Sequence, residues 1–249
     1  MLRAERELVW ADEFDGTAGS VPTPSFWTHE IGGHGWGNGE LQTYTDRSDN
    51  AFLDGHGNLC VVGRRTGDSF TSARLTSKGL VQFQYGRFET RLKVPAGAGL
   101  WSAVWLLGAN IDDAPWPACG EIDVVEHVSA KPDRVFGTVH CPEFFQDNGL
   151  SGDHVAAEPF TDGFHVFAID WAEDRIAWSV DGLPYFEVTR TGLESSWVFD
   201  HPFYVMVNLA VGGWLGGDVS EDTRFPATLQ IDYIRIYSSQ PPPTLGEIG

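Results

Sequence analysis

The feature that most constrains this chain is a group of three acids inside an apolar, β-branched segment. Residues 121–126 read Glu-Ile-Asp-Val-Val-Glu. Side chains alternate between the two faces of a strand, so Glu121 and Asp123 point the same way and Glu126 points the other way. One extra residue, a β-bulge, restores the parity and places all three acids on one surface. We therefore predict a bulged strand here.

Such an acid-rich strand has two interpretations. Acidic strand residues are usually part of a solvated face. Clustering like charges costs free energy, however, and strongly perturbed acids concentrate at functional sites. Two carboxylic acids flanking one bond are what glycoside hydrolysis requires. The run alone leaves structure and catalysis evenly balanced, so the rest of the chain must decide between them.

Turn-forming residues favour an all-β fold. The 249 residues include 29 Gly and 14 Pro, and few segments have the spacing of an amphipathic helix. Strand-like runs cover 59–64, 72–75, 85–94, 101–107, 120–128, 134–140, 164–171, 175–180, 203–211 and 229–237. Short strands separated by Gly/Pro turns are typical of a sandwich or barrel, with any helix confined to a loop.

The chain reads as one domain with a tail. Sandwiches of this length are often single domains, so we expect one catalytic domain over residues 1–237. Residues 238–249 begin with Ser, Ser and Gln and then contain three consecutive prolines. Consecutive prolines favour an extended, unpaired backbone, so this part is predicted to be a tail or the start of a linker.

Charge narrows the class of partner. The chain has 35 acidic and 16 basic residues, a formal net charge of −19. This argues against nucleic acid or an anionic membrane as partner. It also disfavours sulfated or uronic polysaccharides, which would be repelled, so a neutral polymer fits better. Acidity that serves solubility alone is the alternative explanation.

The cysteines and the N-terminus bear on location. Cys60, Cys119 and Cys141 are an odd number, which excludes a dense disulfide framework. Cys119 and Cys141 flank the predicted acid-bearing hairpin, so a bridge between them is one option. No apolar run is long enough to span a membrane, and the N-terminus lacks the apolar stretch of a signal peptide. The protein is either intracellular or begins here after a removed signal.

Several of the ten tryptophans have positions that suit sugar binding. Trp36, Trp116 and Trp214 occur in Gly- or Pro-rich loops. A large flat ring on a loop is well placed to stack on the apolar C–H face of a sugar. Trp101 and Trp105 are four residues apart and share one face of a strand, either in the core or on the floor of a cleft.

Nearly the whole chain resembles glycoside hydrolase family 16, in particular its laminarinase branch. The matching segments are 9–14, 35–44, 85–89, 116–126, 137–140, 201–203, 208–213 and 232–237. The family signature is Glu-x-Asp-x-(x)-Glu, and residues 121–126 fit its six-residue, bulged form. The related lichenases use the five-residue form, which favours laminarinase activity here. Cys141 departs from the pattern, since glycine is more usual at that position.

The resemblance implies a β-jelly-roll sandwich of two antiparallel sheets with a concave substrate cleft. It implies an endo-acting, retaining hydrolase of β-1,3-glucosidic bonds in neutral β-glucans such as laminarin. Glu121 would be the nucleophile, Asp123 an assisting carboxylate and Glu126 the general acid/base, with no cofactor for catalysis. We expect the charges of Asp123 and Glu121 to raise the pKa of Glu126.

Further site residues follow from position and resemblance. The substrate-binding candidates are Asn38, Arg74, Trp101, Trp105, Trp116, His140, Asn208 and Trp214. His140 lies on the strand opposite the acids, and we expect it to hydrogen-bond to them. Arg74 equally suits a surface ion pair, and Asn208 a polar strand end. In similar enzymes a structural calcium is held at positions matching Glu13, Gly57 and Asp232, and oxygen ligands suit calcium. A turn without metal is the alternative.

The partner implied is a β-1,3-glucan or mixed-linkage glucan. We expect the protein to be a monomer, and to be secreted because the substrate is a polymer. A non-catalytic glucan-binding module on the same fold is a second hypothesis. Such modules typically lose the acids, and Glu121 and Glu126 are both present. A third hypothesis is another specificity on this fold, for mixed-linkage glucan, galactan or xyloglucan.

Overall fold

The computed structural model describes residues 6–238. Within this range the chain forms two sheets, joined by turns, short 3-10 segments and two four-residue helices. The predicted proline-rich tail, beyond Ser238, lies outside the described residues. No helix among the described residues is long and apolar enough to cross a membrane.

The larger sheet has ten strands, eight of them in one continuous order. In spatial order these are β16 (Leu183–Thr189), β15 (Arg175–Val180), β14 (His165–Ala172), β9 (Gly86–Lys93), β18 (Ala227–Tyr237), β5 (Leu59–Thr66), β6 (Ser69–Ser72) and β3 (Gln42–Tyr44). Two more strands pair with members of this order: β1 (Leu8–Asp12) with β18, and β4 (Ala51–Leu53) with β5.

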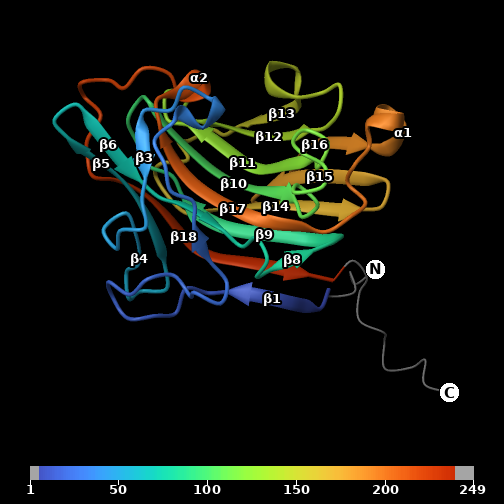
Figure 1. The fold of residues 1–249 in the computed structure, drawn as a ribbon, viewed down its shortest axis with the longest axis horizontal. Helices are drawn as coiled ribbons and strands as arrows, with labels where there is room; N and C mark the ends of the chain where they lie inside the picture. Colours follow the sequence, from blue (N-terminus) through green and yellow to red (C-terminus); the bar gives the residue numbers. More distant parts are fainter. Residues whose placement is uncertain (1–5, 239–249) are drawn as a thin grey trace.

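The smaller sheet has eight strands and carries the acid run. Its order is β13 (Leu150–Val155), β12 (Arg134–His140), β11 (Glu121–Val128), β10 (Leu100–Gly108), β17 (Phe203–Val211), β7 (Arg74–Thr76) and β2 (Thr28–His29), with β8 (Gln82–Phe83) also beside β17. The first five run side by side in Figure 1. Helices are confined to connections, namely η1 (Gly35–Gly37), η2 (Gln146–Asn148), α1 (Arg190–Leu193), η3 (Glu194–Ser196) and α2 (Gly213–Gly216).

The all-β, two-sheet prediction is confirmed, but the structure differs from it in detail. Strands β3, β4, β13 and β16 are among those that lie outside the predicted runs. The β3–β6 pair is parallel, whereas every other strand pair in the two sheets is antiparallel in residues 6–238. The run 72–75, predicted as one strand, is two strands. Ser72 ends β6 in the larger sheet, Ala73 is fully buried, and Arg74 begins β7 in the smaller sheet. Local alternation cannot show that the chain changes sheets.

The main core lies between the two sheets. Strand β9 alternates strictly, with Phe88 and Leu92 in the core. Strands β10 and β17 are buried along their full length, so they are covered on both faces. Leu100, Val104 and Leu106 of β10 face the main core. Their neighbours on the other face of the sheet join separate apolar clusters.

All three cysteines are buried and free, so the Cys119–Cys141 option is wrong. Cys119 belongs to the cluster on the outer face of the smaller sheet, with Trp105 and Met206. Cys141 belongs to the main core on the inner face. Two thiols packed into different clusters cannot bridge without backbone movement.

The neighbours Val124 and Val125 on β11 are both buried in the main core. In a regular strand only one of two neighbours would face inward. We predict that Val124→Ala and Val125→Ala each lower the free energy of unfolding by about 1–3 kcal/mol, measured by urea denaturation.

The matched control is Val155→Ala on β13, where the side chain is 49% exposed and the cost should stay below about 0.5 kcal/mol. A regular strand would instead show one costly and one nearly silent change at 124 and 125.

Candidate active site

The acids of β11 all face the outer side of the smaller sheet. Pairing with β10 places them opposite three residues of one face: Glu121 opposite Leu107, Asp123 opposite Trp105, and Glu126 opposite Ala103. The register with both neighbouring strands shifts between Asp123 and Glu126. Val124 and Val125 absorb that shift by both pointing into the core. The predicted bulge is therefore confirmed.

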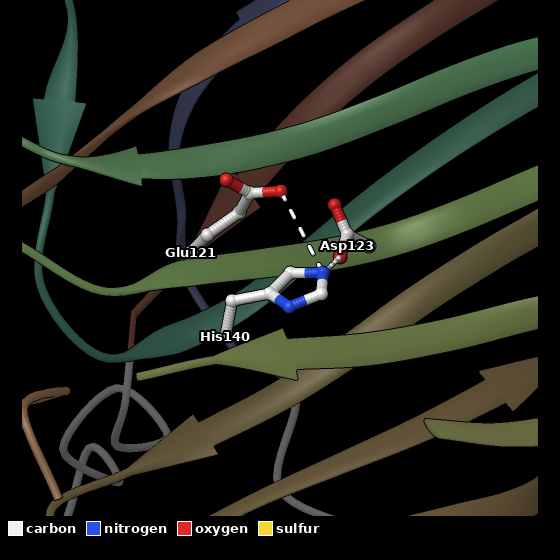
Figure 2. A group of neighbouring side chains, drawn as sticks. All are labelled: Glu121, Asp123 and His140. Carbon is white, nitrogen blue, oxygen red and sulfur yellow. Dashed lines mark ion pairs between the residues drawn. The ribbon is translucent and has the colours of Figure 1, made fainter. Parts of the chain in front are cut away.

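Strand β12 brings a histidine to the acids. His140 pairs with Glu121 in the ladder, as the hairpin prediction required. Its Nε2 lies 3.4 Å from Asp123 Oδ2 and 3.9 Å from Glu121 Oε1 (Figure 2). These are ion-pair distances, and Asp123 Oδ2 has no hydrogen-bond partner among the described residues, so the expected hydrogen bond from His140 is not formed. Figure 2 shows one ring nitrogen of His140 directed at both carboxylates, so a protonated His140 would face two negative charges.

Glu126 has its own donors. The indole Nε1 of Trp101 donates to Oε1 at 3.2 Å, and the Thr138 hydroxyl donates to Oε2 at 3.2 Å. Glu126 is buried, so these two bonds supply polar partners that water does not. Trp101 and Thr138 come from the strands on either side of β11, which fixes this carboxyl between them.

Burial dominates the acid–base behaviour of the cluster. It raises the pKa of Glu121 and of Glu126 to about 8, and that of Asp123 to about 7. The charge of Asp123 is the second cause for both glutamates, and His140 acts in the opposite direction. The expected contribution of the Asp123 charge to the pKa of Glu126 is present, but burial is the larger cause. Because all three pKa values are raised, the cluster as a whole retains protons near neutral pH.

A row of paired residues crosses the sheet beside this cluster. It runs from Arg74 on β7 through Asn208, Ala103 and Glu126 to Phe136 on β12. Directly paired residues share a face, so the row puts Arg74 and Asn208 on the side of the acids. Both residues are far from Glu126 in the sequence and reach it only through strand pairing.

Arg74 lies between aromatic rings. Its guanidinium carbon is 4.6 Å from the ring centre of Trp36 and 4.8 Å from that of Trp105. Its Nε also donates to Glu30 Oε2 at 2.5 Å, so the ion-pair alternative is realised, but in a largely buried place. The positive charge of Arg74 lowers the pKa of Glu121 relative to burial alone.

Asn208 lies inside β17, so its interpretation as a strand-end residue is wrong. Its Oδ1 accepts from Trp105 Nε1 at 2.8 Å, and its Nδ2 donates to the Tyr44 hydroxyl at 3.1 Å. Trp105 is buried on the outer face. The amide of Asn208 therefore orients an aromatic side chain that lies opposite Asp123.

The loop tryptophans approach the same face. Trp214, on α2, is 56% exposed and meets Trp101 edge-on, with ring centres 6.0 Å apart. Its indole Nε1 donates to Asn38 Oδ1 at 3.3 Å. Trp116 lies with its ring centre 5.9 Å from that of His140. The eight substrate-binding candidates thus gather around the acids.

Sequence reasoning missed several polar residues at the site. Four of them contact predicted site residues: Glu30 contacts Arg74, Glu40 contacts Asn38, Tyr44 contacts Asn208 and Thr138 contacts Glu126. The fifth, Gln42, donates to Glu40. One signal was available for three of them, since alternating side chains of an extended segment share one side. Glu40, Gln42 and Tyr44 alternate in this way and are all buried.

The calcium positions meet through strand pairing. Asp12 pairs with Ile234 and Ile231 with Leu59, which brings the backbones at 13 and 57 next to Asp232. The carboxylates there are engaged, because Arg235 holds Glu13 at 2.7 and 2.8 Å and Arg91 holds Asp232 at 2.5 Å. The residues therefore fit an ion only through their backbone carbonyls.

One side-chain group in residues 6–238 has the spacing to share a metal ion. It consists of Glu121, Asp123 and His140, the acid cluster itself. Carboxylates held together for acid–base chemistry have the same spacing, so this grouping does not by itself indicate a metal.

Comparison with known proteins agrees with this geometry. Residues 39–235 match the family model described as Glycosyl hydrolases family 16. The Beta-glucanase of Rhodothermus marinus is 42% identical over 245 residues, covering 93% of this chain and 85% of that protein. Glucan endo-1,3-beta-glucosidase A1 of Niallia circulans is 35% identical over 266 residues, covering 95% of this chain but 38% of its own.

A solved structure is similar over the same length. The laminarinase catalytic domain of Thermotoga maritima MSB8 has a TM-score of 0.88 and 40% sequence identity, covering 95% of this chain and 99% of that one. The family model spans most of the chain, including the bulged acid strand and the residues paired with it. The chain therefore belongs to glycosyl hydrolases family 16.

Proposed function

We propose that this protein is an endo-acting, retaining hydrolase of β-1,3-glucosidic bonds in neutral β-glucans such as laminarin. The observation that carries the proposal is the bulged strand β11, which presents three acids on one face among exposed and buried tryptophans. Similarity to proteins named for β-glucanase and laminarinase activity supports the substrate class. The formal net charge of −19 suits a neutral polymer.

In the proposed mechanism Glu121 attacks the anomeric carbon while Glu126 protonates the departing glycosidic oxygen. Retention requires the two carboxyl groups to be roughly 5–5.5 Å apart on either side of the bond. Burial raises the pKa of Glu126 to about 8, which keeps this acid protonated at neutral pH. Burial raises the pKa of Glu121 to about 8 as well, so the two coupled glutamates compete for protons. The positive charge of Arg74 lowers the pKa of Glu121, which favours Glu121 as the member that ionises and attacks.

The second half of the reaction depends on the electrostatic coupling between Glu121 and Glu126. Once Glu121 becomes an ester, the cluster loses one negative charge. The charge of Glu126 raises the pKa of Glu121. Because electrostatic coupling is reciprocal, loss of the Glu121 charge should lower the pKa of Glu126 at that point. Glu126 then takes a proton from the water that hydrolyses the intermediate. Asp123, opposite Trp105, would assist by holding charge between the two glutamates.

The substrate would lie along the outer face of the smaller sheet. Trp101, Trp105, Trp116 and Trp214 are the proposed stacking residues, and Trp214 is the most accessible of them. Asn38, Arg74, His140 and Asn208 are the proposed polar contacts. A non-catalytic binding module is less well supported, because Glu121 and Glu126 are both present and have partners. Release of sugar from laminarin, lichenan and agarose would separate the specificities.

We further propose that the enzyme acts outside the cell, since a glucan polymer does not enter a cell. We also propose that it is a monomer. Residues 1–237 would form one catalytic domain, and residues 238–249 a tail. A structural calcium held by the backbone at Glu13, Gly57 and Asp232 is part of this proposal. A Cβ built at Gly57 would lie 3.9 Å from the Glu13 carbonyl oxygen, which supports the proximity of these two segments.

We predict that Glu126→Ala lowers the rate on laminarin by roughly 10²- to 10⁴-fold, the size of a general-acid contribution. Glu121→Ser should abolish hydrolysis. Both variants should stay folded, because each removes one carboxyl from a cluster of like charges. Reducing-sugar release and circular dichroism check the two statements.

Azide distinguishes the two roles, since it attacks without needing a general base. On a substrate with a good leaving group, Glu126→Ala should give an azide product of retained configuration and Glu121→Ser an inverted one. Retained product from Glu121→Ser would contradict the assignment of the nucleophile.

Asp123→Asn should move both limbs of the pH–rate profile to lower pH. The negative charge of Asp123 raises the pKa of Glu121 and of Glu126, so its removal lowers both. The acid limb reports ionisation of Glu121 and the alkaline limb reports loss of the Glu126 proton. Glu187→Gln, on the half-exposed pair with Arg175, is the matched charge control and should leave the limbs in place. A shift of one limb alone would argue against a shared cause.

Calcium should raise the unfolding temperature by about 5–10 °C at roughly 100 times its Kd, and a chelator should reverse the change. Magnesium should do less, because it demands tighter octahedral geometry. Glu13→Gln should keep the calcium effect, since the carbonyl and not the carboxylate is the proposed ligand. An unchanged unfolding temperature with and without calcium would remove the metal from the proposal.

A further inference from the structure

A fourth carboxylate is buried beside the proposed site and has no part in the mechanism above. Glu40 is 7% exposed and follows the loop that contains Trp36 and Asn38. Its Oε1 accepts from Asn38 Nδ2 at 2.9 Å. Its Oε2 accepts from Gln42 Nε2 at 2.6 Å and from the Tyr44 hydroxyl at 3.0 Å. Three side-chain donors thus converge on one buried acid.

The charge of Glu40 fixes the direction of the hydrogen bonds around it. An ionised carboxylate only accepts, so Asn38 must turn its amide nitrogen toward Glu40. This leaves Asn38 Oδ1 as an acceptor, and Trp214 Nε1 donates to it at 3.3 Å. The first relay therefore runs from Glu40 through one amide to an exposed indole.

A second relay leaves Glu40 in another direction. The Tyr44 hydroxyl has one proton and gives it to Glu40, so it can only accept from Asn208 Nδ2, at 3.1 Å. Asn208 Oδ1 is then the acceptor for Trp105 Nε1, at 2.8 Å. Tyr44, Asn208 and Trp105 are all buried, so water cannot substitute for a reversed partner.

Both relays end beside the acids. Trp214 meets Trp101 edge-on, and Trp101 donates to Glu126. Trp105 lies opposite Asp123 and under the guanidinium of Arg74. The two indoles that receive their orientation from Glu40 therefore both lie on the β10 side of the acid strand, one beside Trp101 and the other opposite Asp123.

The backbone clamps Glu40 to the segment that bears Trp214. Glu40 forms an isolated bridge with Gly212, and the Leu41 amide donates to the Val211 carbonyl at 2.8 Å. A Cβ built on Gly213 would lie 3.3 Å from Glu40 Cγ. The end of β17 and the start of α2 are thus held against Glu40, which fixes the position from which both relays start.

We propose that Glu40 is a positioning residue for substrate binding, whose negative charge sets the orientation of Trp105 and Trp214 through Asn208 and Asn38. This inference rests on the proposed glucan hydrolysis. Glu40 touches neither the substrate nor the reacting atoms, so it acts on the binding of sugar rings and leaves proton transfer alone. A glutamine at 40 has one acceptor and one donor, so one of the two relays must reverse and lose its indole bond.

The first test is Glu40→Gln, which keeps size and removes the charge. KM for laminarin should rise about tenfold to a hundredfold, as expected for losing hydrogen bonds to a charged group, while kcat changes less than about threefold. The limbs of the pH profile should stay in place, in contrast to Asp123→Asn. Asp12→Asn is the matched control, because Asp12 is a buried carboxylate that also accepts an indole bond, from Trp27 at 2.9 Å. Its KM should equal that of the wild type.

A double-mutant cycle tests the route. If Glu40 acts through Trp214, the KM effects of Glu40→Gln and Trp214→Phe will be far from additive. Should Glu40→Gln fail to fold, Tyr44→Phe breaks the second relay at a residue that is not a proposed substrate contact, and it should raise KM. The inference would be overturned by an unchanged KM in these variants or by additive effects in the double-mutant cycle. It would also be overturned if Glu40→Gln lowered kcat as much as it raised KM, or if Asp12→Asn raised KM equally. Wild-type protein that releases no sugar from any β-1,3-glucan would sink the proposed function instead.

Discussion

The acid strand depends on one constraint, that carboxyl groups taken out of water need partners. The bulge at Val124 and Val125 puts apolar side chains in the core and all three acids on the outer face. That face is itself largely buried, so the pKa of each acid rises. Donors from β10 and β12 and the imidazole of His140 then meet the acids. The burial that raises the pKa of the acids thus comes from the same outer face that is proposed to bind the sugar chain.

Both faces of the smaller sheet are covered by packed side chains. Its inner face packs in the main core, and its outer face carries tryptophans, tyrosine and methionine among polar groups. Aromatic side chains solve two problems there, because a ring buries area while its N–H or O–H binds a neighbour. Trp101 serves Glu126, and Trp105 is held by Asn208. The cover of the sheet and the surroundings of the acids are therefore the same residues.

Several predictions succeeded because they rested on short-range periodicity. Parity along 121–126 gave the bulge, and the hairpin gave His140 opposite Glu121. Others failed where the outcome depended on distant segments. Residues 72–75 divide between two sheets, and Cys119 and Cys141 pack in different clusters. A polar strand end was the alternative for Asn208, and it is wrong because the partners that hold its amide inside β17, Tyr44 and Trp105, are far away in the chain.

The sequence by itself determined the all-β class, the strand that bears the acids and the family resemblance, because alternation and turn residues act over a few positions. Only the tertiary structure decided which donors meet each carboxyl, how strongly burial shifts the pKa, and that Glu40 is joined to two indoles. Those facts depend on the register of strands far apart in the chain. Register is fixed by the packing of whole faces, which no local pattern specifies.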